Sequence, residues 1–539
     1  MSKDHNEVKR ALEEIVGPEY VSDDPAVLES YSKTSRPDII LNIIRPEFVV
    51  LPGSADEVEA IIKIANRFKK PFVSGGQMYQ SSFTPSKEGF ITIDMKRMNR
   101  ILEINEKDMY AVVEPTVTFA ELNAEAQKRG LFVRTPYAGA VASVIGNHLY
   151  LGFAGVDWRF GIAPQNILAV EWILPTGEKI KLGSLGLPGA RWIWGEGPGP
   201  DLRGLLRGLL GVSCGLGIVT KMAVKLYPWP GQRDFTELFK GPIPSCKNAW
   251  YGGWKKEFHP PRDRFRTYLI AYRDIKSLIE AIRMIGEAEI ATVCQHFSAW
   301  FLCFEAAQSQ EEHWREWKTG YYQTLGDIFG PGVTAYPLIV HIVGFTSPKQ
   351  VKYEERILKE IVEETGGKFL SEDSKAYYNW VTCGKAADFW RSAISRGSRP
   401  KGAFAPIRHP YDSLNFIAKV YDYIDEWFRN QLIQNGLPPD TNASIMAYNF
   451  GHIAHLEVHF MFDQSNPDEV AIASKLIKLG FHDDIEKGIY PLGIPPPAHK
   501  VLGPLLHNYH ILLAKIKKLL DPNGVSNPPH PIMPEEYIT

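Results

Sequence analysis

The sequence is poor in cysteine, with five cysteines among 539 residues. They are Cys214, Cys246, Cys294, Cys303 and Cys383, and no two of them form a CxxC pair. A disulfide framework, a zinc ribbon and a self-contained iron–sulfur cluster each depend on paired or closely spaced cysteines. The scattered positions in this chain therefore argue against all three.

The chain also lacks an excess of charge of either sign and any long apolar run. Its formal net charge is −2, and no long basic run occurs. Nucleic-acid binding, which needs a concentrated positive face, is not expected. No apolar stretch is long enough to span a bilayer, and the charged residues 1–17 are typical of an amphipathic helix rather than a secretory signal. We expect a soluble, cytoplasmic protein.

The first third of the chain alternates apolar strands with amphipathic helices. Residues 48–51 are typical of a buried strand, and Ser54 with Glu57 has the spacing of a capping box at the start of a helix. Thr118 and Glu121 repeat that spacing. Further strands are expected at residues 71–74, 90–94, 109–114, 169–174, 179–182 and 218–226.

The pattern changes after residue 230. Aromatic residues become frequent, and strands are expected at residues 265–272, 335–345 and within 443–462, with amphipathic helices between them. Residues 502–520 are typical of a helix, which ends at the turn sequence of residues 521–524. Together these patterns predict an α+β protein.

Two segments rich in small residues and glycine run into apolar strands, at residues 141–174 and 210–226. Glycine lets the backbone approach a ligand closely, and backbone N–H groups bind anionic phosphate oxygens. The order and spacing of these segments, together with VEP at residues 113–115 and DPNGVSNP at residues 521–528, point to a flavin nucleotide.

The same segments resemble the vanillyl-alcohol oxidase superfamily, whose FAD domain is of the p-cresol methylhydroxylase type. The resemblance implies a two-lobed FAD-binding domain in residues 1–230, an inserted α+β cap (substrate) domain in residues 231–500, and a C-terminal segment, residues 501–539, that returns to the FAD domain. The matching pieces are RPEFVVLPGSADEVEAIIKIANRFKKPFVSGG, IDMKRMNRILEINEKDMYAVVEPTVTFAEL, ASVIGN, ILAVEWILPTGE, GVSCGLGIVTKMAVKLYPWP and LLDPNGVSNPP.

The resemblance also implies which residues bind FAD. Two loops would hold the pyrophosphate, with Ser143 and Asn147 adding side-chain donors, and further positions would line the adenine, ribose and flavin. The first loop carries no histidine at the position of covalent attachment, so we expect noncovalent FAD. The implied cofactor residues are Ser74, Gly75, Gly76, Gln77, Met78, Tyr79, Ser143, Ile145, Gly146, Asn147, Gly211, Ser213, Gly217, Ile218, Val219 and Asn527.

A histidine-rich strand is the best candidate for the catalytic residues. Side chains alternate along a strand, so His455, Glu457 and His459 point to one face. His452 faces the other way unless a bulge near Gly451 reverses the phase. In the family, substrate lies between flavin and cap, where the reaction needs a nearby base. We expect these histidines to be the candidates for that base, with Tyr79 as a further candidate.

The substrate-binding and metal-binding residues are less clearly marked. His452 and His459 have the spacing of the metal-binding histidines in the family's D-2-hydroxy-acid dehydrogenases, but Ala498 precedes His499, where that branch has a glutamate. We therefore expect no metal. The para-phenol enzymes of the family place a Tyr-Arg pair in the same region, and it is also missing. Glu457, His499 and Arg408 remain as candidates to bind substrate.

These observations predict an FAD-dependent oxidoreductase that dehydrogenates an alcohol or hydroxy acid by hydride transfer to flavin N5. A para-substituted phenol is the second substrate class. A noncatalytic flavin-binding subunit of a redox complex and a carbon–carbon or ether-forming flavoenzyme are the alternatives. The electron acceptor, which includes the option of a partner protein, is not determined by any motif, and we expect a homo-oligomer.

Overall fold

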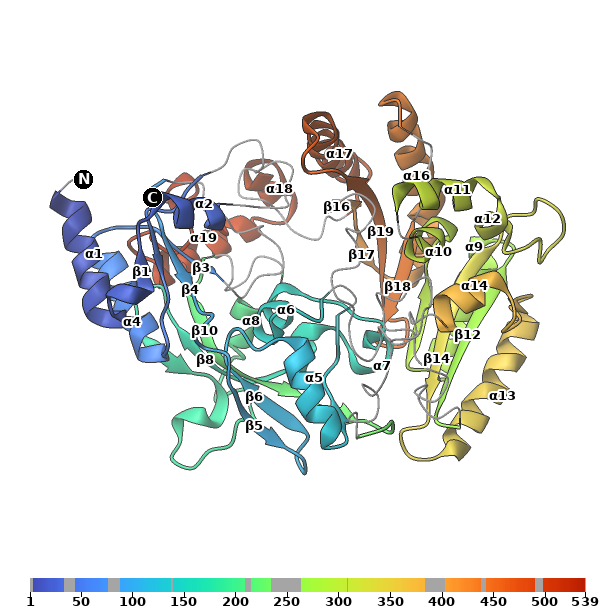
Figure 1. The fold of residues 1–539 in the computed structure, drawn as a ribbon, viewed down its shortest axis with the longest axis horizontal. Coiled ribbons are helices and arrows are strands. Elements are labelled where there is room, and N and C mark those ends of the chain that lie inside the picture. Colours follow the sequence, from blue (N-terminus) through green and yellow to red (C-terminus); the bar gives the residue numbers. More distant parts are fainter. Residues whose placement is uncertain are drawn as a thin grey trace.

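The computed structural model describes residues 3–32, 44–75, 88–136, 139–208, 215–233, 263–307, 309–382, 403–437, 443–489 and 498–538. Both chain ends lie at one end of an elongated molecule, and a large sheet with its helices forms the other end (Figure 1). No helix within these ranges is long and apolar enough to cross a membrane.

The first lobe is built on a sheet with strand order β1-β2-β4-β3, in which β2, β4 and β3 are parallel. Helix α4 covers this sheet with a fully buried apolar stripe, as its periodicity predicts. At its start the Ser54 Oγ accepts the Glu57 N–H (3.2 Å), while the Glu57 carboxylate accepts the Gly53 N–H. The elements are α1 (Lys3–Val16), η1 (Pro18–Tyr20), β1 (Val21–Ser22), α2 (Pro25–Tyr31), β2 (Phe48–Val50), α4 (Ala55–Arg67), β3 (Phe72–Gly75) and β4 (Ile91–Asp94).

The second lobe contains an antiparallel sheet with strand order β5-β6-β10-β8-β9. Helix α5 begins with both halves of the predicted capping box of Thr118 and Glu121. Strand β5 is not among the predicted strands. The elements are β5 (Ile101–Asn105), β6 (Tyr110–Val113), α5 (Phe119–Lys128), β7 (Leu131–Phe132), α6 (Val144–Tyr150), α7 (Asp157–Phe160), η2 (Ala163–Asn166), β8 (Ile167–Ile173), β9 (Lys179–Lys181), η3 (Gly183–Gly186), α8 (Arg203–Leu206), β10 (Ile218–Lys225) and β11 (Tyr227–Pro228).

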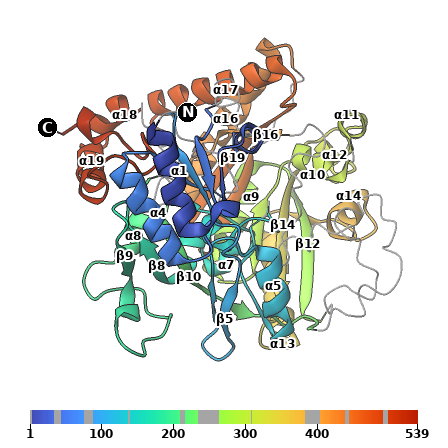
Figure 2. The ribbon, with the colours of Figure 1, turned by 60° about the vertical axis from the view of Figure 1, so that its left-hand side comes forward.

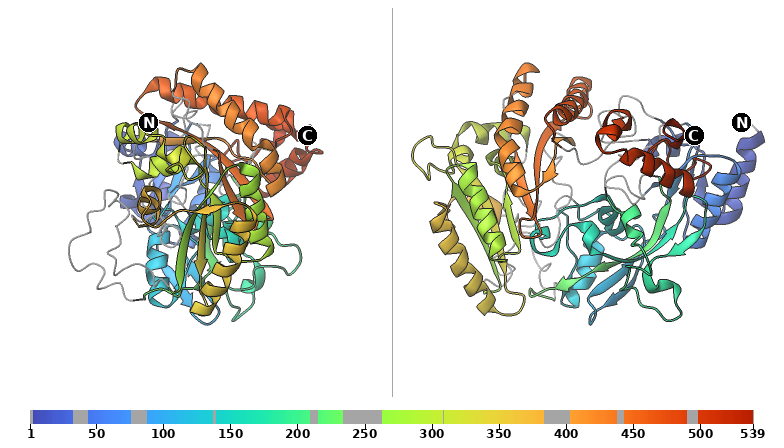
Figure 3. Two further views of the ribbon diagram at one scale, coloured as in Figure 1. Left: turned by 90° about the vertical axis from the view of Figure 1, so that its right-hand side faces the viewer. Right: turned by 180° about the vertical axis from the view of Figure 1, so that it is seen from behind.

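The cap is a large sheet with strand order β15-β12-β14-β13-β18-β19-β16, with β17 also paired to β19. The views from the front and from behind both show helix α13 on the outer side of this sheet, away from the first two lobes (Figures 1 and 3). The strands are β12 (Phe265–Tyr272), β13 (Val293–His296), β14 (Tyr336–Val343), β15 (Lys368–Phe369), β16 (Ala403–Arg408), β17 (Tyr411–Asp412), β18 (Ser444–Tyr448) and β19 (Ile453–Phe462). The helices are α9 (Ile275–Glu287), α10 (Ala299–Ala306), α11 (Gln310–Lys318), α12 (Tyr321–Thr324), α13 (Pro348–Glu364), α14 (Lys375–Tyr377), η8 (Tyr378–Thr382), α16 (Leu414–Gln434) and α17 (Pro467–Glu486).

The two faces of the cap sheet bury different side chains. Ala454, Leu456 and Val458 pack with the outer helices, in a core that includes residues of α9, α13, α16 and α17. The opposite face carries the aromatic core, which we define as the cluster around Phe297, Tyr448 and Trp380. A one-residue step along a strand therefore moves a side chain from the helix layer to the aromatic core.

The C-terminal segment returns to the first lobe. It contains α18 (His499–Leu505), α19 (Tyr509–Leu520) and η10 (Pro534–Glu536), and Figure 2 shows α19 near α1 and α4. His507 and Asn508 have positive φ values of 49° and 62°, which break the single helix predicted for residues 502–520. The tail then runs parallel to β3, with Phe72 N–H donating to Val525 O and Asn527 N–H to Phe72 O, both at 2.8 Å. The domain boundaries at 230 and 500 stay predictions.

A buried ammonium group fixes this return. Lys517 is 2% exposed and pairs with the fully buried Asp521 at 2.7 Å. Its Nζ also donates to the carbonyls of Gly215 (2.6 Å) and Ser526 (2.7 Å). Asp521 in turn accepts the N–H groups of Val525 and Ser526, both at 3.0 Å. The tail, the start of β10 and the edge of β3 are thus held by one ion pair and its hydrogen bonds.

Replacing Lys517 tests this joint. In Lys517→Met the Asp521 carboxylate stays buried without its cation, and removing one partner of a buried pair costs about 3–5 kcal/mol. We expect a clearly lower thermal unfolding temperature and loss of bound flavin on purification. Lys518, the next residue, is exposed, so Lys518→Met is the matched control. Equal stability of the two variants would contradict the role of Lys517.

Candidate functional site

The first predicted cofactor loop begins at the end of β3. Ser74 and Gly75 are the last residues of that strand, which pairs directly with β4 in parallel. Gly76, Gln77, Met78 and Tyr79 lie outside the described residues, as do Gly211 and Ser213 of the third glycine-rich segment. Their roles stay predictions.

The second loop forms the start of helix α6. The Ser143 Oγ accepts the Gly146 N–H at 3.0 Å and donates to the Pro115 carbonyl at 2.6 Å. The expected donation from this hydroxyl to a phosphate therefore does not agree with the structure, because its hydrogen is already used. The N–H of Ile145 has no acceptor among the described residues, so the backbone rather than Ser143 offers the donor here.

A buried ion pair supports the same loop from behind. The Asn147 side-chain oxygen accepts a hydrogen bond from Arg134 Nη1 at 3.1 Å. Arg134 is fully buried and contacts both carboxylate oxygens of Asp157, at 2.6 and 2.8 Å. Gly152 has no space for a side chain, because the Asn147 amide would lie 2.1 Å from its Cβ. Sequence patterns gave no signal for Arg134 or Asp157, since nothing local marks them as partners.

Helix α7, which begins at Asp157, also enters the cap. Trp158 is fully buried within the helix-side core of the cap, and its indole N–H donates to the Ile290 carbonyl at 2.9 Å. The N–H groups of Asn449 and Phe450, in the turn before β19, donate to the carbonyls of Asp157 (3.1 Å) and Trp158 (2.7 Å). The ion pair of Arg134 and Asp157 therefore connects the second predicted cofactor loop to the turn before β19 in the cap.

The side chains at the start of β10 are buried in protein cores, so they do not offer contacts to a cofactor. The side chains of Ile218 and Val219 are each 1% exposed and belong to the cores of the two lobes. Gly217 has φ +95°, and a Cβ there would lie 2.1 Å from the Ile173 carbonyl. Packing against β8 alone requires this glycine, so its presence is not evidence for a cofactor.

Asn527 is the strongest cofactor candidate among the described residues. Its side chain is buried at 3% exposure, and its φ of 44° places it in the left-handed region. Neither its side-chain oxygen nor its nitrogen has a hydrogen-bond partner among the described residues. A buried amide without partners is costly unless a ligand satisfies it. Together with the Ile145 N–H and the edge of β3, it fits a flavin nucleotide.

On the cap side, His455 lies at the boundary with the second lobe. It is 1% exposed, and its ring is edge-on to Phe153 of the second lobe, with ring centroids 5.0 Å apart. Tyr411 of β17 stacks on it at 4.1 Å, and the Tyr448 hydroxyl lies 3.4 Å from its Nδ1. Its Nε2 has no partner among the described residues. Burial lowers the pKa of His455 to about 3, so its imidazole is neutral at pH 7.

Glu457 and His459 form a pair on the same face of β19. The His459 Nε2 lies 2.9 Å from Glu457 Oε1, with the two side chains 18% and 10% exposed. Burial alone would raise the pKa of Glu457, but the charge and hydrogen bond of His459 outweigh it and lower that pKa to about 2. His409 lies near, its ring centroid 6.5 Å from that of His455. The alternation predicted for His455, Glu457 and His459 is present.

Two candidate histidines from the sequence, His452 and His499, do not lie with His455, Glu457 and His459. His452 is exposed in the turn before β19. His499 is buried at the start of α18, where the Pro531 carbonyl faces it, in the C-terminal segment rather than the cap. Within the described residues no group of three or more His, Cys, Asp or Glu side chains could hold a metal ion.

Arg408 was expected to bind substrate, and the structure corrects this. It is fully buried and forms ion pairs with Asp483 (2.8 Å) and Asp484 of α17. Its guanidinium also lies 5.3 Å from the Tyr423 ring centroid and 4.9 Å from that of Trp427, both in α16. It pairs across the sheet with Val458, on the helix side. Its charge is therefore neutralised within the helix layer.

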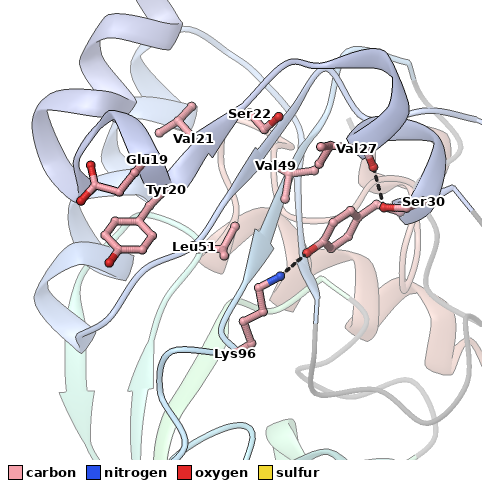
Figure 4. Close-up of a pocket in the computed structure, with 10 residues that line it drawn as sticks. Glu19, Tyr20, Val21, Ser22, Val27, Ser30, Val49, Leu51 and Lys96 are labelled. Carbon is pink, nitrogen blue, oxygen red and sulfur yellow. Dashed lines mark hydrogen bonds between the residues drawn. The ribbon is translucent and has the colours of Figure 1, made fainter.

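A separate pocket of about 630 Å³ lies in the first lobe, between β1, α2 and β2. Figure 4 shows residues of its lining, Lys96 among them. The Lys96 ammonium donates to the Tyr31 hydroxyl at 2.9 Å. Tyr31 donates in turn to Asp94 at 2.5 Å. These polar groups hydrogen-bond to one another. The pocket lies in the first lobe, whereas His455, Glu457 and His459 lie in the cap.

Residues 46–183 match the family model described as FAD binding domain. The chain carries an FAD-binding domain. The solved structure of p-cresol methylhydroxylase with substrate bound has a TM-score of 0.73 at 18% identity, covering 98% of this chain and 96% of that one. The predicted fold, an α+β FAD-binding domain of this type with an inserted cap, is therefore confirmed.

Two curated relatives match at higher identity over shorter segments. The 1'-carboxy-chondrochloren decarboxylase of Chondromyces crocatus is 36% identical over 236 residues, which are 42% of this chain and 41% of the relative. The mitochondrial D-lactate dehydrogenase [cytochrome] of Arabidopsis thaliana is 31% identical over 186 residues, 34% of this chain and 31% of the relative. The match thus spans less than half the length of either relative.

Asn527 can be tested without knowledge of the substrate. We expect Asn527→Gly, which removes the amide and suits the positive φ, to weaken FAD binding about tenfold, since each lost hydrogen bond contributes about 1 kcal/mol. Stability of the flavin-free protein should not fall, because the amide has no hydrogen-bond partner among the described residues. Titration of apoprotein with FAD measures the affinity, and Asn523→Gly on the exposed turn is the control. Unchanged FAD affinity in Asn527→Gly would remove Asn527 from the cofactor site.

Proposed function

We propose that this chain is an FAD-dependent oxidoreductase that dehydrogenates an alcohol or hydroxy-acid-type substrate, with FAD held noncovalently. The observation that carries the proposal is the junction between the two parts of the molecule. The second lobe contributes Phe153, and the cap contributes His455, whose Nε2 has no partner among the described residues. A substrate placed at this junction would meet a neutral imidazole and the edge of an aromatic ring.

The proton acceptor in this proposal is His459. Its partner Glu457 stays ionised, since its pKa is lowered to about 2, and an adjacent carboxylate orients an imidazole and stabilises the imidazolium that forms. His455, with a pKa of about 3, is too weak a base for this task at pH 7. When bound, FAD supplies the hydride acceptor.

The surroundings of His455 favour a second substrate class, a para-substituted phenol. Tyr411 stacks on the His455 ring, Phe153 meets it edge-on, and Tyr448 contacts it from β18. Such an aromatic lining accommodates a planar ring. The electron acceptor in either case is oxygen, a quinone or a redox partner protein, and we propose a homo-oligomeric assembly.

Anaerobic bleaching of the bound flavin tests the proposal. The panel contains D-lactate, glycolate, benzyl alcohol and 4-methylphenol, so that hydroxy acids, alcohols and phenols are compared directly. Bleaching by one class supports the oxidoreductase and selects the substrate. A flavin-containing protein that no member of the panel bleaches contradicts the proposed substrate classes. A purified protein without flavin that added FAD does not stabilise supports the alternative of a noncatalytic subunit.

Loss of each histidine should slow flavin reduction to a different extent. We expect His459→Gln to slow flavin reduction at least about 100-fold at every pH between 5 and 9. His455→Asn should lower the rate at every pH in that range and leave the profile unchanged, because a group with a pKa of about 3 does not titrate there. Flavin content should stay at the wild-type level in both. A changed profile in His455→Asn would reverse the assignment.

A further inference from the structure

One buried side chain of the cap lacks any role in the site described so far. Gln295 of β13 is fully buried, and neither its Oε1 nor its Nε2 has a hydrogen-bond partner among the described residues. A glutamine amide offers one acceptor and two N–H donors, and leaving all of them unmade is costly. Native proteins rarely contain such a group unless water or a ligand satisfies it.

The register of the sheet places Gln295 on the face of His455. Gln295 pairs with Met446 of β18, and Met446 pairs with His455 of β19. One strand therefore separates the two side chains, a distance of about 9.5 Å across the sheet. Along β13, Val293 belongs to the aromatic core whereas Cys294 belongs to the helix-side core, so alternation directs Gln295 to the aromatic core as well.

The neighbouring residue shows that this orientation matters. His296 faces the helix layer, where its Nδ1 meets the Pro337 carbonyl at 2.7 Å and its Nε2 meets the Tyr421 hydroxyl at 3.2 Å. The polar side chain on the helix side of β13 is thus fully satisfied by protein. Gln295, its neighbour on the opposite face, has no such partners among the described residues, although both residues are 0% exposed.

The surroundings of Gln295 restrict what it could bind. Across the sheet it is flanked by Ile339 and Met446, and along the strand by Val293, which are all uncharged. A carboxylate buried beside these residues would have no cation to offset its desolvation, which makes an anion unfavourable. A neutral group with both donor and acceptor capacity, such as an amide or a hydroxyl, matches the glutamine amide.

We propose that Gln295 is a specificity-determining residue that binds a neutral hydrogen-bonding group at the far end of the substrate, while the carbon to be oxidised lies beside β19. The inference rests on the proposed function, which supplies the reacting end. It adds that the substrate spans the face of the cap sheet from β19 to β13. Substrates that end in an apolar group or a carboxylate should be disfavoured there.

The first test needs no substrate. Gln295→Met keeps the side-chain volume and removes the polar atoms. If the amide is unpaired in the ligand-free protein, the thermal unfolding temperature should rise by about 2 °C or stay constant. Gln434→Met, at an exposed position at the end of α16, is the matched control. A fall in unfolding temperature for Gln295→Met alone would show that Gln295 binds protein groups, and would overturn the proposal.

The second test measures binding without turnover. Equilibrium dialysis with dithionite-reduced protein compares 4-(hydroxymethyl)benzamide, 4-methylbenzyl alcohol and 4-(hydroxymethyl)benzoate, which differ only in the group opposite the alcohol. We expect wild-type protein to bind the carboxamide at least tenfold more tightly than either of the others. Gln295→Met should abolish that preference, and Gln434→Met should keep it.

The two proposals fail in different ways. If no alcohol bleaches the flavin but the protein still prefers the carboxamide, the proposed dehydrogenation is overturned and the Gln295 subsite is supported. Bleaching with equal affinity for the three compounds, or a preference that survives in Gln295→Met, would overturn the subsite and leave the oxidoreductase standing.

Discussion

The position of the whole candidate site depends on the buried ion pair between Arg134 and Asp157. Through Asn147 it supports the start of helix α6, and through the backbone of α7 it is joined to the turn before β19. A fully buried pair of this kind is costly to separate, since either charge alone would be left in an apolar surrounding. This ion pair therefore connects the predicted cofactor loop rigidly to β19, although the two belong to different parts of the chain.

Periodicity in the sequence was sufficient to predict most of the elements and the orientation of the histidine strand. The strand at residues 265–272 agrees with β12 at both ends, and α4 buries the stripe that its spacing predicts. His455, Glu457 and His459 share a face because strand alternation is a local property of the backbone. Signals of this kind need no knowledge of the partner element.

The errors arise where a side chain finds a partner far away in the sequence. Arg408 is neutralised by Asp483 and Asp484, and no local pattern reveals that α17 lies over β16. Ser143 matches a phosphate-binding motif, yet its hydroxyl is used by Pro115. Gln295 carried no signal, because a single glutamine in an apolar strand gains meaning only when the structure shows that neither of its polar atoms has a partner among the described residues.

The tail strand beside β3 has a consequence for the order in which the protein matures. Nearly the whole chain separates Phe72 from Asn527, yet the two are adjacent through a backbone hydrogen bond. A ribosome therefore releases the first lobe and then the entire cap before the segment that pairs with the edge of β3 exists. That edge of β3 gains its neighbour only when the tail has been synthesised.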